Sequence, residues 1–134
     1  MERRNFIRQT ALITTAFGFG ARPEPLLGHG DFRYRLDQKW CKADPGAFPV
    51  KNCHEMVMDK RGRIFMTTDD TRNNVLVFSQ DGAVLDAWGR EYPGAHGLTV
   101  HDENGTEFLY ITDYERHEVI KTTLDGKVIR IFNW

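Results

Sequence analysis

The sequence has little of several features that would assign a chain quickly to a class. Its 134 residues include two cysteines and five prolines, and 18 Lys and Arg offset 19 Asp and Glu. Without a basic stripe, nucleic-acid binding is not expected. After residue 30, no stretch of helical period has convincing length. What is present is 40% hydrophobic and 12% aromatic residues, enough to bury a core.

Residues 1–30 carry the pattern of an export signal. A pair of arginines near the start is followed two residues later by a bulky apolar pair, and then by a charge-free run from Thr10 to Ala21. This arrangement is typical of a twin-arginine signal. The run is too short and too rich in Gly and Thr to remain as a membrane-spanning helix. We therefore expect a periplasmic or extracellular protein that contacts a membrane only through an uncleaved signal segment.

The two cysteines, Cys41 and Cys53, lie on either side of a segment rich in Pro and Gly. Export would expose them to an oxidising environment, so a disulfide is one interpretation. Two separate buried thiols are the other, because the sequence does not fix their distance. A metal pair of Cys53 with His54 is not expected, since neighbouring residues of a strand point to opposite faces.

The rest of the chain contains one pattern twice, at residues 54–89 and 96–133. Each copy is opened by a histidine, and His54 and His96 are 42 positions apart. Each then has four apolar runs separated by turns. A four-stranded unit with a period of 40 to 50 residues is typical of β-propeller blades. Four later pairs of the two copies are 44 positions apart: Val75 and Val119, Asp81 and Asp125, Gly82 and Gly126, and Trp88 and Phe132.

The pattern predicts an all-β fold with eight strands in the two copies. We expect two-residue turns with positive φ at Asp81-Gly82, Asn104-Gly105 and Asp125-Gly126. The closing aromatics Trp88 and Phe132, like Trp40, are expected to pack between blades. The predicted strands are residues 54–58, 63–67, 74–79 and 83–88 in the first copy, and 97–101, 107–112, 118–123 and 127–132 in the second.

Two blades do not close a propeller ring, which takes four to eight. The run at residues 32–40 resembles the last strand of each copy, so we expect it to be a closing strand. Its three partner strands would come from sequence beyond Trp134. The chain is therefore expected to be the N-terminal part of a longer protein or a truncated gene product, with residues 31–134 forming a partial propeller.

The second copy resembles the NHL-repeat family of β-propellers. The string from Leu109 to Asp113, followed by Val119-Ile120, fits the family pattern closely. The first copy fits the same pattern if the alignment slips by one loop residue, so that Asp69 takes the position of the family's aspartate. The resemblance covers residues 50 to 134 and implies a propeller of NHL type, with six blades expected in the full length.

Within that family, the string from Ala95 to Val100, with Tyr110 to Asp113 and His117 to Lys121, looks like the catalytic domain of peptidyl-α-hydroxyglycine α-amidating lyases. That family uses histidines at the start of inner strands to bind an axial zinc ion, with arginine and tyrosine nearby. The resemblance implies Zn²⁺ bound by His96 and His54. The zinc histidines of the family come from alternate blades, whereas these two open consecutive copies, and His96, followed by Gly97, is the better counterpart.

The residues alone, without the resemblance, also predict a site on the propeller axis. Equivalent positions of successive blades converge on the propeller axis, so the imidazoles of His54 and His96 should face each other there. Converging neutral imidazoles suit Zn²⁺, and a third ligand would make a catalytic site with an open position. The alternative is that each histidine hydrogen-bonds a neighbouring blade. The third ligand and the catalytic acid or base are expected beyond residue 134.

Several polar residues near the histidines have expected roles. Tyr114 is near the loop position where the lyase family has a tyrosine. His117 is expected to be a solvated or blade-bridging loop residue, and Asp113 to accept backbone N–H groups in a tight loop. The residues expected to supply outer hydrogen-bond acceptors or a proton-transfer group are Glu55, Asp59, His101 and Asp102.

These observations favour two alternative functions. One is an exported, zinc-dependent carbon–nitrogen lyase that acts on a small-molecule or peptide ligand on the propeller axis. The other is a non-catalytic periplasmic propeller that binds a peptide, glycan or protein partner, because a fold does not determine a function.

Overall fold

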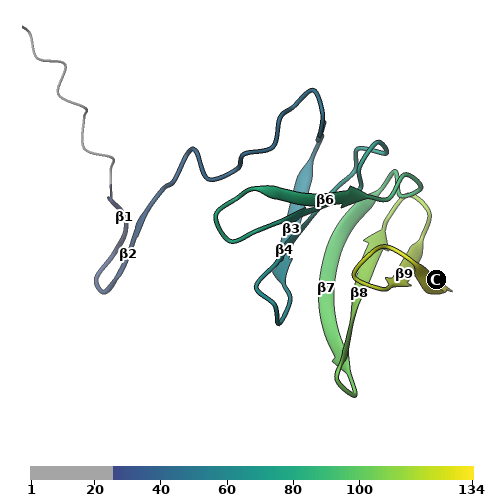
Figure 1. Ribbon diagram of the computed structural model, residues 1–134. Coiled ribbons are helices and arrows are strands. Elements are labelled where there is room, and N and C mark those ends of the chain that lie inside the picture. The colour runs from purple at the N-terminus through teal and green to yellow at the C-terminus, as the bar shows by residue number, and fades with distance from the viewer. Residues whose placement is uncertain (1–25) are drawn as a thin grey trace, which may run out of the picture. The chain divides into compact units, whose positions relative to one another are not determined.

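The structure, a computed structural model, describes residues 26–134 and is all-β, as predicted. Its ten strands form antiparallel sheets (Figure 1). In this range no helix is long and apolar enough to cross a membrane. The chain divides into two compact units, one ending at Leu36 and one spanning Asp37–Trp134. Residues 1–25, most of the predicted signal segment, lie outside the described residues.

The first unit contains a hairpin of β1 (Leu26–His29) and β2 (Phe32–Arg35). The strand predicted at residues 32–40 is thus shorter than expected, and within the described residues it pairs with β1. In the residues that follow, the Asp37 carboxylate accepts the backbone N–H of Lys39 at 2.9 Å. Such a local hydrogen bond favours a turn over a strand.

The second unit contains two four-stranded sheets whose strands follow chain order. Every strand predicted for the two copies is found, with ends that differ by at most two residues. The first sheet consists of β3 (Cys53–Met58), β4 (Ile64–Thr68), β5 (Val75–Phe78) and β6 (Val84–Trp88), and the second of β7 (Ala95–Glu103), β8 (Thr106–Asp113), β9 (Glu118–Thr122) and β10 (Val128–Asn133).

The register of the first two strands of each sheet explains the slip between the repeat periods. Met56 pairs with Met66 in the first sheet, and Leu98 pairs with Ile111 in the second. Leu98 is 42 positions after Met56, whereas Ile111 is 45 after Met66, so the β7–β8 hairpin is three residues longer (Figure 1). Its Asn104-Gly105 turn has φ values of 53° and 91°, as predicted for a two-residue turn.

The two Asp-Gly turns differ from the prediction. The backbone N–H of Ser79 donates to the carbonyl of Ala83 at 2.9 Å, so three residues separate this pair. Only Gly82 has a positive φ, of 84°. The longer turn has a local cause, since the Ser79 hydroxyl donates to Asp81 and accepts the N–H of Ala83. In the Asp125-Gly126 turn, the backbone N–H of Thr123 likewise donates to the carbonyl of Lys127, so three residues again separate the pair.

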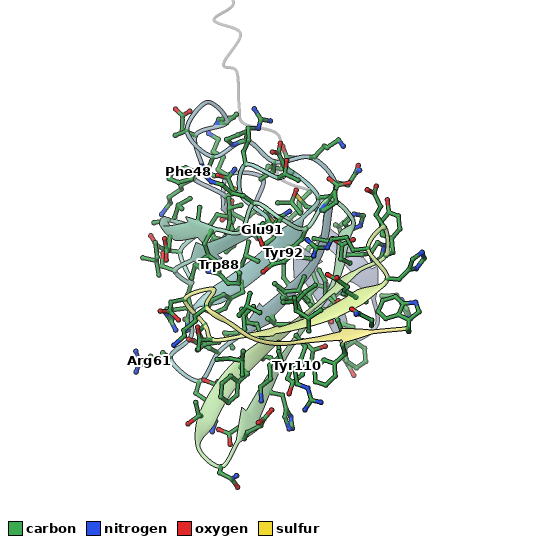
Figure 2. All side chains as sticks on the ribbon, turned by 90° about the vertical axis from the view of Figure 1, so that its right-hand side faces the viewer. Phe48, Arg61, Trp88, Glu91, Tyr92 and Tyr110 are labelled. Atoms are coloured by element: carbon green, nitrogen blue, oxygen red, sulfur yellow. The ribbon has the colours of Figure 1, made fainter. Side chains whose placement is uncertain are left out.

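The core lies between the two sheets. Along β5 and β8, alternate residues point into it, as the period of two requires. Asn74 ties the connection between the sheets to this core, because its buried side-chain amide donates to the carbonyl of Tyr92 at 2.8 Å. Figure 2 shows Tyr92 near Trp88. The buried apolar residues of this core are Phe65, Val75, Val77, Tyr92, Ala95, Leu98, Leu109, Ile111 and Ile120.

Candidate functional site

The two repeat-opening histidines occupy the same kind of backbone irregularity. The β3–β4 register shifts between Cys53 and Met56, and the β7–β8 register shifts between Ala95 and Leu98. His54 and His96 therefore lie in matching β-bulges at the start of the strand that forms one edge of each sheet. Bulges bend the strand and redirect its side chains, and they are over-represented next to active sites.

The bulges bring the two imidazoles together. The ring centroids of His54 and His96 lie 4.1 Å apart, with 23° between the ring planes. Both side chains are exposed to solvent. The prediction that these residues face each other is confirmed, and it is the packing of β3 beside β7 that places them so.

An aspartate fixes the backbone just before each histidine. Asp69 accepts the backbone N–H of Asn52 at 3.0 Å, and Asp113 accepts that of Gly94 at 3.2 Å. Asn52 and Gly94 each lie two residues before their histidine. Asp69 thus takes the place of Asp113 in the first copy, which confirms the one-residue slip proposed from the sequence.

The two aspartates are held differently. Asp113 is buried and also accepts the backbone N–H groups of Glu115 and Arg116, each at 3.0 Å, as predicted for a tight loop. Asp69 instead receives the side-chain amide of Asn52 at 2.7 Å. This hydrogen bond lowers the pKa of the Asp69 carboxyl, because it stabilises the ionised form.

The residue after each histidine has a different role in each copy. Glu55 connects the two sheets, and Gly97 allows β7 and β8 to lie close together. Glu55 Oε2 accepts the backbone N–H of Leu98 at 2.7 Å, a bond that crosses from β3 to β7. At the equivalent position, Gly97 lets β8 approach, since a Cβ there would lie 2.5 Å from Thr112 Oγ1. The difference between the two copies at this position therefore has a structural reason.

Tyr114 completes the group at this end of the sheets. Its ring stands edge-on to His96, with 6.2 Å between centroids and 81° between planes. Its side chain is 52% exposed. The loop position predicted from the sequence thus places a phenol beside the histidine pair.

The other predicted acceptors lie away from the histidines. Asp59 follows the far end of β3, where its carboxylate accepts the N–H of Arg63 and pairs with the guanidinium of the same residue. Asp102 lies near the far end of β7 and pairs with Lys60. His101, beside Asp102, has the ring of Tyr110 as its aromatic neighbour. Of the four residues expected to support the histidines, Glu55 alone lies next to them.

His117 lies in the β8–β9 loop, as predicted, with an exposed side chain and a φ of 54°.

Neither interpretation of the cysteines holds in this structure, where Cys41 and Cys53 are both free and exposed. Partial desolvation of the sulfur raises the pKa of the Cys53 thiol, and Cys41 and Asp69 add to that shift.

The histidine pair offers two imidazole nitrogen ligands to a transition metal. Tetrahedral Zn²⁺ takes four ligands, and a catalytic site leaves one of them to water or substrate. Between residues 26 and 134, no group of three or more His, Cys, Asp or Glu side chains is placed to hold a metal. The pair would supply two of the four ligands only after the stacked rings turn, because the nitrogen lone pairs lie in the ring planes. The chain matches no protein-family model, no curated protein and no solved structure.

Proposed function

We propose that this chain is part of an exported NHL-type β-propeller that binds zinc through His54 and His96 and acts as a carbon–nitrogen lyase. The observation that carries the proposal is the stack of the two imidazoles, 4.1 Å apart, from matching bulges of equivalent strands. A bulge at a histidine in both copies favours a use for that side chain at the shared position.

The propeller part of the proposal is supported by how the sheets stack. Each sheet has four antiparallel strands in chain order, and the first strands, β3 and β7, lie against each other. In a propeller, the first strand of each blade lines the central channel. Further blades would place more side chains around the same axis, where the two missing ligand positions would be filled.

The resemblance supplies the substrate class, a peptidyl-α-hydroxyglycine. Its cleavage breaks the bond between the amide nitrogen and the hydroxylated carbon, and yields a peptide amide and glyoxylate. A bound zinc ion would polarise a substrate oxygen or lower the pKa of a water. In this chain, the histidines would hold the ion, Glu55 would hold their strands together, and the Tyr114 hydroxyl would stand beside the substrate.

Metal analysis tests the zinc site. The full-length protein is dialysed against Zn²⁺ and then against buffer, and its zinc content is measured for the unchanged protein and for His54→Ala and His96→Ala. His101→Ala is the matched control, because its exposed ring lies at the far end of β7. We expect both site variants to lose zinc while the control keeps it. Unchanged zinc in both site variants would refute the proposal.

A second assay separates a lyase from a binding protein. The zinc-loaded full-length protein is incubated with a peptidyl-α-hydroxyglycine, and glyoxylate is measured over time. Release that requires zinc and is lost in His96→Ala supports the lyase. Zinc binding without release of glyoxylate favours the second candidate.

That second candidate is a non-catalytic propeller that binds a peptide or glycan. The observation that favours it is the exposed aromatic surface formed by Tyr114 with the two imidazoles. Aromatic side chains with polar tips are common in recognition surfaces. Such binding would persist when zinc is removed with a chelator, whereas lyase activity would not.

A further inference from the structure

The turn at the tip of the β7–β8 hairpin carries a sequence that the first copy of the repeat lacks. It reads Asn104-Gly105-Thr106, an asparagine followed two residues later by a threonine. This spacing, with a residue other than proline between, is the acceptor pattern of N-linked glycosylation. The corresponding turn of the first sheet, from Asp59 to Arg63, contains no asparagine. Three residues make a short pattern, so the structure around them decides whether it can be used.

The hairpin carries this turn beyond the neighbouring sheet. The β7–β8 hairpin is three residues longer than the β3–β4 hairpin. Three residues divided between two strands extend the tip by about 5 Å, at roughly 3.3 Å per residue. Figure 1 shows the β7–β8 hairpin reaching past the β3–β4 turn. The turn therefore lies where a bulky group clears the first sheet.

The acceptor side chains are free at this tip. Asn104, Gly105 and Thr106 are all exposed. Among the hydrogen bonds of residues 26–134, those of this hairpin involve neither the Asn104 amide nor the Thr106 hydroxyl. A Cβ at Gly105 would meet no atom within 4 Å, so the space beside the turn is open. The nitrogen that would form the bond and the hydroxyl that the pattern requires are thus both accessible.

Other groups hold the turn in place. Asp102 accepts the backbone N–H of Gly105 at 2.8 Å and pairs with Lys60 of the first sheet. The φ values of Asn104 and Gly105, 53° and 91°, are ones that asparagine and glycine tolerate. The shape of the turn therefore does not depend on a hydrogen bond from the Asn104 side chain, which is left for modification.

A polar groove lies beside the turn and gives room for sugars. Its volume is about 520 Å³. Hydroxyl and charged groups line it, and sugar hydroxyls can both donate hydrogen bonds to such groups and accept them. The groove thus suits the first sugars of a chain attached at the turn. Its lining from the two sheets includes Lys60, Arg61, Arg63, Thr106, Glu107 and Thr123.

We propose that Asn104 is the acceptor of an N-linked glycan. The co-reactant is an oligosaccharide joined through a diphosphate to a polyprenyl lipid. The Asn104 amide nitrogen forms a bond to the anomeric carbon of the first sugar and loses one proton. The bond from that carbon to the phosphate oxygen breaks, and the lipid diphosphate leaves with the electron pair.

The modification rests on the export part of the proposed function, because this pattern is used in secreted proteins. It depends neither on zinc nor on catalysis. Asn104 follows the far end of β7, whereas His96 lies near the start of that strand. A glycan there would leave the histidine end of the sheets open.

Transfer to the purified full-length protein tests the proposal. The folded protein is incubated with an oligosaccharyltransferase and a lipid-linked oligosaccharide, and the peptide that contains Asn104 is analysed by mass spectrometry. We expect this peptide to gain the mass of the oligosaccharide in the unchanged protein and in Thr106→Ser. Asn104→Asp keeps a residue that tolerates positive φ but lacks the amide nitrogen, and Thr106→Val lacks the hydroxyl, so neither should gain mass.

Folded protein that gains no mass at Asn104, or gain that persists in Asn104→Asp, overturns the proposal. A synthetic peptide of residues 100–109 then tells whether the hairpin or the sequence prevents transfer. Fractionation of cells that make the full-length protein separates this result from export. The glycan is expected in the exported fraction alone. If no protein is exported, that part of the proposed function fails, whereas the outcome of the transfer assay still decides whether Asn104 is an acceptor.

Discussion

Glu55 and Leu98 form a hydrogen bond that joins the two sheets beside the histidines. The Glu55 carboxylate of β3 accepts the backbone N–H of Leu98 at 2.7 Å. Within the described residues, β7 is the edge of its sheet, so this N–H has no strand partner on that side. One side chain therefore satisfies a nearly buried donor and holds the strands that carry the two imidazoles.

Glu55→Ala should lower the free energy of unfolding by about 1–3 kcal/mol, because it leaves the N–H of Leu98 without an acceptor. Glu55→Gln should cost less than half as much, since the amide oxygen can accept the same bond. Urea unfolding followed by tryptophan fluorescence measures both. An equal loss in the two variants would show that the charge, and not the hydrogen bond, matters.

Asp113→Ala should be among the most damaging polar substitutions in the chain. It removes one acceptor from the backbone N–H groups of Gly94, Glu115 and Arg116, at a cost of about 2–4 kcal/mol. Asp69→Ala should cost less, because Asp69 accepts from a single residue, Asn52. Thermal unfolding of the two variants side by side would reveal the order, and a greater loss for Asp69→Ala would contradict it.

Acid should weaken the loop that follows β4. The Arg72 side chain and backbone N–H bind the Asp70 carboxylate and lower its pKa to about 2. Because this pKa is lower in the folded protein than in the unfolded chain, the stabilisation is complete above pH about 4 and is lost as pH falls toward 2. Urea midpoints at several pH values should fall less steeply for Asp70→Asn. Identical slopes would mean that Asp70 does not contribute.

Two glycines with similar backbone angles should respond differently to alanine. Gly126 has a φ of 87°, and an added Cβ would lie 2.6 Å from the Trp88 ring. Gly105 has a φ of 91°, and a Cβ there would meet nothing within 4 Å. Gly105→Ala should therefore cost about 1–2 kcal/mol from the backbone alone, and Gly126→Ala distinctly more. Equal costs in chemical unfolding would mean that Trp88 moves freely.

The strands and the histidine pair were predictable from the sequence because both follow from the repeat. Alternating apolar residues locate each strand, and two copies of a pattern put His54 and His96 at equivalent positions. The slip that brings Asp69 into register was also predictable, since one loop residue more or less does not disturb a strand.

Other features depend on contacts between distant residues and left no local pattern. From the sequence alone, the Glu55 carboxylate could equally well be hydrated or accept the backbone N–H of Leu98. It accepts that N–H because β3 and β7 lie close together in the fold. The longer turn at Asp81-Gly82 depends on the hydroxyl of Ser79. Trp40 follows a strand-like run, but the side chain it meets is 38 positions away, at Phe78.

The bulges at His54 and His96 have one more consequence. In a regular strand, successive side chains point to opposite sides. A change in the direction of one side chain therefore shifts its neighbours and disturbs the alternation that fills the core. An extra residue in a bulge breaks this tie. Replacement of either histidine should therefore leave the folding of both sheets intact. New ligands can be selected at these two positions at little cost to the scaffold, so the same frame is open to different chemistries during evolution or engineering.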